Sequence, residues 1–290
     1  MSEGGHDPEF MRRIAENYER YFVPTIGAPV AADLMKAANL RPGERVLDAA
    51  CGTGVVTKLA AERIAPGGSV AGLDPNPAML AVARATTPSG VSIDWHRAPA
   101  EDIPFPDESF DVVLCGMGLQ FFSNKEAGLR EFHRVLVPGG RLVANVPGPA
   151  PPPLEIMADA LARHIGSESA AFVQTVFSLH DPDDVRNLAT QAGFEDVDVR
   201  SAETSLELPP PAEFLRQYVS STPLAGVVAQ ADEERRAALE NEFSKKCQAF
   251  APTGTLLGGV KMTTLLATKY RRVQLQDGMT PARGTRAHRR

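Results

Sequence analysis

Short apolar runs alternate with amphipathic stretches through the first half of the chain. The apolar runs are rich in valine and leucine, and the stretches between them repeat their apolar residues at helical spacing. Strands separated by helices pair in parallel through right-handed crossovers, so the pattern predicts an α/β fold. Pro138-Gly139-Gly140 is expected to form a turn from helix to strand. The expected strands cover residues 45–48, 69–73, 91–95, 110–115 and 141–146, and the expected helices between them cover 55–65, 77–85 and 125–136.

Helical spacing also marks the start of the chain and most of its second half. Residues 10–23 and 29–38 are expected to be helices, the first ending near Pro24. Five of the seven residues 147–153 are proline, which neither a helix nor a central strand accepts, so the chain is expected to change character there. Beyond this segment the pattern predicts helices over 154–165, 170–178, 181–193, 212–220 and 231–249, with strands near 194–201 and 258–270.

The run Val46-Leu47-Asp48-Ala49-Ala50-Cys51-Gly52-Thr53-Gly54 joins a buried strand to an acidic residue and a glycine-rich turn. Asp74 stands at the end of the next strand, twenty residues beyond Gly54. This layout is typical of a nucleoside-binding βαβ unit, in which the glycines let the ligand approach the backbone and the carboxylate accepts hydrogen bonds from a ribose. A tight strand-to-helix turn without a ligand is the alternative interpretation.

Two details of the turn indicate which nucleoside it binds. A dinucleotide site needs a third glycine, but Thr57 stands in its place. Asp48 would repel a pyrophosphate, whereas it would pair with an ammonium group. A ligand with a ribose, a cationic amino-acid part and no phosphate fits these facts, and S-adenosylmethionine is such a ligand.

With three further motifs, the chain resembles the class I S-adenosylmethionine-dependent methyltransferases, in particular the branch of the ubiquinone and menaquinone C-methyltransferases. The motifs are Gly72–Leu80, Ala100–Asp111 and Arg134–Gly140, in the family's order. The resemblance implies a Rossmann-like sheet of seven strands, mostly parallel, with the last strand antiparallel. It also implies helical cap insertions over the substrate, at 154–178 and 212–249.

The resemblance further implies where the cofactor lies. Asp48, Gly52 and Gly54 would hold its methionine end, and Asp74 would accept hydrogen bonds from both ribose hydroxyls or, alternatively, cap the helix that begins near Pro75. S-adenosylhomocysteine would be the product. The expected cofactor contacts are Tyr18, Asp48, Ala50, Gly52, Gly54, Asp74, Pro75, Met79, Ala100, Glu101, Cys115 and Gln120.

Several of these residues have a structural alternative. Tyr18, or Tyr21 on the same N-terminal helix, would reach the sulfonium or carboxylate of the cofactor, or else belong to a buried aromatic stripe. Met79 would pack on the adenine or in the core. The chain has Ala98-Pro99-Ala100-Glu101 where the family usually has Gly-Asp-Ala-Glu, so adenine would depend on the Ala100 backbone, with Glu101 or Asp102 as further candidates.

The catalytic residues are not identified by the sequence. Cys115 has no neighbouring base to activate it and is expected to be a small packed residue at a strand end, beside the cofactor. Gln120 is expected to line the methyl-transfer site. No metal pattern occurs among the three cysteines. The candidate bases, none with a partner in the sequence, are His96, His164 and His180.

Composition narrows the class of protein. Hydrophobic residues make up 43% and charged residues 23%, as in globular proteins, and no apolar run approaches the ~20 residues of a membrane span. The start of the chain does not resemble a signal peptide, so a cytoplasmic protein is expected. Net charge is −6, and the five arginines of residues 272–290 leave the rest more acidic still, which disfavours nucleic acid as a partner.

The sequence thus predicts four parts: N-terminal helices over the cofactor at 1–40, a cofactor-binding core at 41–146, the rest of the sheet with a helical substrate cap at 147–271, and a disordered basic tail at 272–290. The expected reaction is methyl transfer to a small, apolar or aromatic molecule, at oxygen or carbon rather than nitrogen, by a monomer or homodimer. A non-catalytic cofactor-binding relative and a protein methyltransferase are the alternatives. A nicotinamide dehydrogenase is a further rival.

Overall fold

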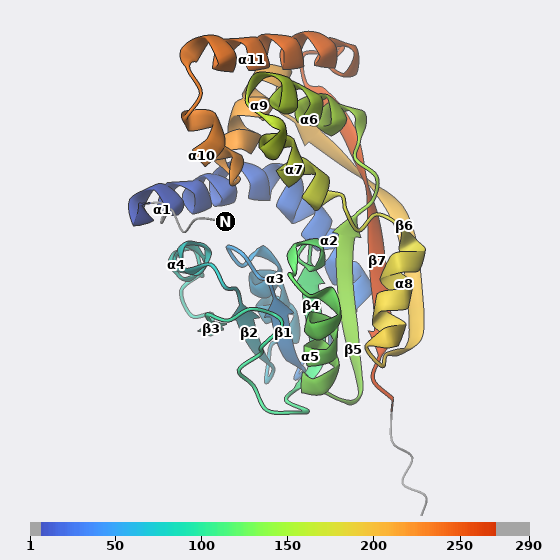
Figure 1. Ribbon diagram of the computed structural model, residues 1–290. Coiled ribbons are helices and arrows are strands. Elements are labelled where there is room, and N and C mark those ends of the chain that lie inside the picture. Colours follow the sequence, from blue (N-terminus) through green and yellow to red (C-terminus); the bar gives the residue numbers. More distant parts are fainter. Residues whose placement is uncertain (1–6, 271–290) are drawn as a thin grey trace, which may run out of the picture.

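The computed structural model describes residues 7–270, and the tail expected at 272–290 lies outside them. Seven strands form one sheet in the order β3-β2-β1-β4-β5-β7-β6 (Figure 1). The first five strands are parallel, and β7 runs antiparallel to both of its neighbours. The predicted sheet is therefore confirmed. The strands are β1 (Arg45–Ala49), β2 (Ser69–Leu73), β3 (Asp94–His96), β4 (Phe110–Gly116), β5 (Leu136–Pro147), β6 (Glu195–Leu208) and β7 (Leu256–Thr268).

Helices cover both faces of the parallel part of the sheet, because successive side chains of each strand point to opposite faces. Val46 packs with helices on one face, and its neighbour Leu47 packs with helices on the other. The helices of the first face are α2 (Ala28–Ala38) and α3 (Val55–Ile64), and those of the second are α5 (Lys125–Val135) and α8 (Pro182–Gln191). Helix α4 (Pro77–Ala85) follows β2.

A separate apolar cluster joins the N-terminal segment to a helical cap, which stands above the carboxyl ends of the parallel strands in Figure 1. The outer ends of β6 and β7 extend beyond the other strands into this cap. Beyond the predicted helices, the cap contains the short helix α10. The cap helices are α6 (Pro152–His164), α7 (Ser167–Val176), α9 (Pro211–Ser220), α10 (Leu224–Ala229) and α11 (Glu233–Cys247), with a 3-10 turn at Gln248–Phe250.

The N-terminal segment differs from the single helix predicted at 10–23. Helix α1 (Pro8–Asn17) continues into a π-helix, η1 (Tyr18–Gly27), and then into α2. Pro24 removes one backbone donor from this stretch, and the Thr25 hydroxyl donates to the carbonyl oxygen of Tyr21 at 2.6 Å. The helix therefore continues from α1 through the π-helix into α2 without a break, and Tyr18 lies at the start of the π-helix.

Among the strands, the boundaries that differ most from prediction are those of β3, β5 and β6. Strand β3 begins at Asp94 rather than near 91, and β6 runs to Leu208 rather than 201. Strand β5 begins at Leu136, directly after α5, and Pro138-Gly139-Gly140 lies where its pairing with β4 shifts register. The predicted turn is thus a bulge within the strand.

Candidate active site

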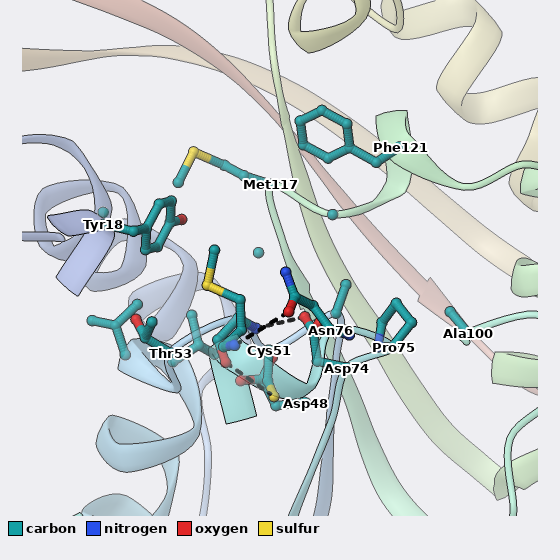
Figure 2. A pocket seen from close by; sticks show the side chains of 18 of the residues that line it. Tyr18, Asp48, Cys51, Thr53, Asp74, Pro75, Asn76, Ala100, Met117 and Phe121 are labelled. Atoms are coloured by element: carbon teal, nitrogen blue, oxygen red, sulfur yellow. Dashed lines mark hydrogen bonds between the residues drawn. The ribbon is translucent and has the colours of Figure 1, made fainter. Parts of the chain in front are cut away.

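A cavity of about 520 Å³ lies at the carboxyl ends of β1, β2 and β4, under the N-terminal segment and the cap. Its floor comes from the loop after β1 and the start of α4, and its roof comes from the cap and the segment after β4. Figure 2 shows the labelled side chains around it. The predicted residues that line the cavity are Tyr18, Asp48, Ala50, Gly52, Asp74, Pro75, Met79, Ala100 and Glu101.

Three of the predicted contact residues, Gly54, Cys115 and Gln120, do not line the cavity. A side chain on Gly54 would put its Cβ 2.4 Å from Cη2 of Trp95, so this glycine makes room for the indole. Cys115 is fully buried in the core, and burial raises the pKa of its thiol to about 12. Gln120 is also buried and donates from Nε2 to the carbonyl oxygen of Met117 at 2.8 Å. Their cofactor contacts stay predictions without support from this geometry.

Asp74 is held in place by two backbone N–H groups. Asn76 donates to Oδ1 at 2.8 Å, and Gly52 donates to Oδ2 at 2.9 Å (Figure 2). The helix-cap role considered for Asp74 belongs to Asn76, whose side chain accepts from the first N–H groups of α4. Burial raises the pKa of Asp74, and the two backbone donors oppose that rise. The carboxylate thus ties the glycine loop to β2 while it faces the cavity.

Asp48 lies deeper, at the end of β1. It is 1% exposed, and its Oδ2 accepts from the Thr57 hydroxyl at 2.5 Å. Burial raises the pKa of Asp48 to about 7, and the nearby charge of Asp74 adds to the effect, although the Thr57 hydrogen bond lowers it. A cationic group in the cavity would favour the ionised form of Asp48.

Tyr18 reaches over the cavity from η1. Its ring stacks on that of Phe22, with centroids 4.6 Å apart. Burial raises the pKa of the Tyr18 phenol, and the carboxylates of Asp74 and Glu19 raise it further. Tyr18 is therefore a hydrogen-bond donor at neutral pH, with its hydroxyl directed into the cavity in Figure 2.

Two non-glycine residues of the wall have left-handed backbone conformations, Ala50 with φ of 56° and Met117 with φ of 51°. A left-handed conformation strains a residue that has a Cβ, and it persists only where the surrounding structure holds the backbone in place. The Met117 N–H donates to both the carbonyl oxygen and Oδ1 of Asn145, each at 3.0 Å. Asn145 is buried at the end of β5 and also lines the cavity. Sequence reasoning missed this pair, although each follows or ends a predicted strand.

The Glu101 carboxylate is engaged by the residues that precede α5. Its Oε1 accepts from the Ser123 hydroxyl at 2.9 Å and from the Asn124 N–H at 3.2 Å. Partial burial disfavours ionisation of Glu101, but these hydrogen bonds outweigh it and lower the pKa. The Ala100 segment, which is buried and lines the cavity, remains the candidate for adenine.

The roof of the cavity is largely apolar. Phe121, which is 48% exposed, stacks with Phe172 of α7 at a centroid distance of 6.3 Å and an interplanar angle of 16°. Residues 221–223, between α9 and α10, complete it. The cap therefore does contribute to the wall, as predicted.

None of the histidines proposed as bases lines the cavity in the part of the chain that the structure describes. His96 packs edge-on against Phe105, and His180 Nδ1 lies 2.9 Å from the carbonyl oxygen of Phe177. His164 Nε2 lies 2.6 Å from a carboxylate oxygen of Glu242. Over residues 7–270, no cluster of side chains suited to a metal ion is present either.

Among residues 7–270, one buried polar side-chain atom of the wall has no hydrogen-bond partner. Thr53 is 1% exposed, lines the cavity and leaves its hydroxyl without a hydrogen bond. Gly52, with φ of 55°, has open space where a Cβ would stand. An unpaired buried hydroxyl is costly. With Asp48 and Asp74, these features fit a polar, cationic nucleoside ligand.

The close packing of Trp95 under the glycine loop gives a stability prediction. We expect Gly54→Ala to lower the free energy of unfolding by about 1–3 kcal/mol more than Gly43→Ala. Gly43 has a similar φ, 87° against 83°, but nothing lies within 4 Å of its added Cβ. The difference between the variants in chemical denaturation therefore measures the clash with Trp95 alone. Equal losses would show that the indole moves aside freely.

Comparisons with known proteins identify the family of the chain. Residues 47–144 match the family described as a methyltransferase domain. The chain is 31% identical over 245 residues to nocamycin O-methyltransferase of Saccharothrix syringae. The aligned region covers 79% of this chain and 86% of that protein. It is 42% identical over 127 residues to the ubiquinone/menaquinone biosynthesis C-methyltransferase UbiE of Stenotrophomonas maltophilia, with coverage of 43% and 46%.

Among solved structures, the YcgJ protein of Bacillus subtilis superimposes with a TM-score of 0.54 at 19% identity, over 83% of this chain and 98% of that one. This likeness concerns the fold. No helix within residues 7–270 is long and apolar enough to cross a membrane. The sequence motifs, the sheet order and the long match to an O-methyltransferase lead to one conclusion: the chain belongs to the class I S-adenosylmethionine-dependent methyltransferases.

Proposed function

We propose that this methyltransferase acts on an oxygen or carbon atom of a small, apolar or aromatic acceptor. The observation that carries the proposal is the roof of the cavity, where Met117 and the stacked rings of Phe121 and Phe172 form an apolar wall. A flat or apolar molecule would gain most from burial there. The carboxylates Asp48 and Asp74 lie on the opposite side of the cavity (Figure 2).

The polar side of the cavity would hold S-adenosylmethionine. Asp74 would bind the ribose hydroxyls, Asp48 would attract the cationic methionine end, and the Thr53 hydroxyl would gain the partner it lacks within the protein. When bound, S-adenosylmethionine supplies an electrophilic methyl group. The Tyr18 hydroxyl is placed to donate a hydrogen bond into the same region.

The protein's own contribution is positioning and exclusion of water. Met117, Phe121 and Phe172 would hold the acceptor against the cofactor side, and alignment of reacting atoms at about 3–3.5 Å supplies several kcal/mol. The ionisable side chains of the wall are Tyr18, Asp48, Cys51, Asp74 and Glu101. Burial raises the pKa of Tyr18 and Cys51 and keeps both protonated, and Glu101 is held by Ser123 and Asn124. With Asp48 and Asp74 assigned to the cofactor, we infer that the acceptor is acidic enough to lose its proton without a dedicated side-chain base.

The choice of oxygen or carbon over nitrogen rests on the segment after β4. Amino-group methylation of nucleobases or glutamine usually goes with an (Asn/Asp)-Pro-Pro-(Tyr/Phe) run there, and this chain has Cys115-Gly116-Met117-Gly118. The two relatives described above are named for O- and C-methylation. Both arguments favour phenolic, enolic or carboxylic acceptors.

A panel of acceptors tests the proposal. Methyl transfer from radiolabelled S-adenosylmethionine should reach phenols, aromatic acids or 1,3-dicarbonyl compounds, and should rise with the acidity of the acceptor. Matched amines and unstructured peptides serve as the contrasting arms. Transfer to amines or peptides alone would contradict the proposal. Thermal stabilisation by S-adenosylhomocysteine without turnover on any arm would favour the non-catalytic alternative.

A further inference from the structure

We propose that an apolar side cavity behind Met117 receives a short alkyl substituent of the acceptor. The inference rests on the proposed function, since it concerns the molecule that accepts the methyl group. The side cavity measures about 60 Å³ and lies between η1, the cap helices and the strands β6 and β7. Apart from Tyr218, its wall has only apolar side chains and glycines.

The sequence of β7 explains why this space is empty. Leu256, Gly258, Val260 and Met262 alternate along the strand, so they share the face that meets the cap. Gly258 is the member without a side chain. A Cβ added there would find only Cδ1 of Leu208 within 4 Å, at 3.7 Å, and its φ is not in the left-handed region. Neither crowding nor backbone conformation requires this glycine, so its presence preserves the space.

Met117 forms the partition between the two cavities, because it lines both. Its backbone is fixed by the two hydrogen bonds to Asn145, while its unbranched side chain has several rotatable bonds. The stacked pair of Tyr18 and Phe22 continues the partition, with Tyr18 in the main cavity and Phe22 in the side cavity. A rotation of Met117 would join the two spaces without movement of the backbone.

The size of the side cavity sets the substituent. Close-packed interiors hold few voids larger than a water molecule, and an apolar void of about 150 Å³ accepts benzene. By that scale, the space of about 60 Å³ takes about two to three carbon atoms. The favoured acceptor is therefore an aromatic or enolic compound with a short alkyl group, rather than a bare ring or one with a long chain.

Methionine methyl groups provide separate reporters for the two cavities. Met79 lines only the main cavity and Met262 only the side cavity. Protein labelled with ¹³C-methyl methionine and loaded with S-adenosylhomocysteine would be titrated with phenol, 4-ethylphenol, 4-propylphenol and 4-octylphenol. We expect phenol to leave the Met262 resonance unchanged, ethyl and propyl compounds to shift it and bind about tenfold more tightly, and the octyl compound to lose that gain.

The decisive test is a variant in which a side chain on β7 fills the side cavity. Gly258→Leu should abolish the Met262 shift and the gain from the alkyl group, while the effect of S-adenosylhomocysteine on Met79 is unchanged. Lys261→Leu places the same side chain on the opposite face of β7, at a position where the native side chain is exposed, and should behave as wild type. If Gly258→Leu fails to fold, Gly258→Ala adds one methyl group and should shorten the best chain by about one carbon.

The outcomes separate the inference from the proposed function. If no alkylphenol shifts Met262, the side cavity is a packing void, and the inference is overturned even where phenols are methylated. Equal affinity gains in wild type and Gly258→Leu would overturn it as well. A Met262 shift without methyl transfer to any phenol would support the alkyl site and count against the proposed acceptor atom.

Discussion

Replacement of Asp74 by alanine should weaken S-adenosylmethionine binding by about 1.5–3 kcal/mol, which corresponds to a roughly 10- to 150-fold rise in Kd. The carboxylate is 8% exposed, lines the cavity and is oriented by the N–H groups of Gly52 and Asn76. Its removal takes away the charged acceptor for the ribose hydroxyls and also releases the Gly52 end of the loop. Isothermal titration calorimetry with S-adenosylmethionine and S-adenosylhomocysteine measures the loss.

Asp102→Ala is the matched control, because Asp102, although considered for adenine from the sequence, is exposed and does not line the cavity, so the variant removes the same charge outside the site. It should bind the cofactor as wild type does. Asp74→Asn should fall between the two, since the amide oxygen still accepts one hydrogen bond but carries no charge. Wild-type affinity in Asp74→Ala would remove Asp74 from the ribose site.

Cofactor affinity should be level above about pH 7 and fall by up to about tenfold per pH unit below it, until Asp48 is protonated in the complex as well. The pKa of Asp48 is raised to about 7 in the free protein, mainly by burial. A cationic methionine end binds the ionised form better, so the pKa of Asp48 is lower in the complex than in the free protein. Between the two pKa values, binding must release a proton, and falling pH therefore opposes it. Calorimetry in buffers of different ionisation enthalpy measures that proton directly.

Two variants test whether Asp48 is the group that causes the pH dependence of cofactor affinity. Asp48→Asn keeps the shape of the side chain but cannot titrate, so its affinity should be low and flat across the range. Thr57→Val removes the hydroxyl that lowers the pKa of Asp48 and should move the break in the profile to higher pH. A wild-type profile that stays flat from about pH 5.5 to 8 would contradict the assignment of Asp48 to the cationic end.

The parallel half of the fold could be predicted closely because its signals are local. Strands β1, β2 and β4 are short runs that are mostly buried on both faces, and the motif around Asp48 places a strand, a turn and a helix within twenty residues. The cap could not be predicted as well. Strand β6 extends to Leu208 because it pairs with β7 almost fifty residues later, and only that pairing satisfies its backbone.

The site residues divide in the same way, into those that lie in local motifs and those that only the sheet brings together. Asp48, Gly52 and Asp74 lie in continuous motifs and were expected. Met117 follows β4 and Asn145 lies in β5, and no local pattern links them before the sheet brings their backbones together. Gly54 and Cys115 were expected at the cofactor for their positions in the motif and at the strand end. Gly54 packs under Trp95, and Cys115 is the small packed residue at a strand end that the sequence also predicted. Neighbouring residues of a turn or strand face different sides, so their cofactor contacts stay predictions.

The long pairing of β6 and β7 also bears on how such a protein can diverge. One end of β7 is paired with β5 beside the cofactor half, as in Leu265 opposite Ala144, and the other end faces the cap. Successive side chains of a strand point to opposite faces of the sheet. A single-residue insertion within β7 would therefore turn Gly258, Val260 and Met262 away from the cap. Changes of length should therefore accumulate in the loops between the cap helices, while β7 evolves by substitution alone.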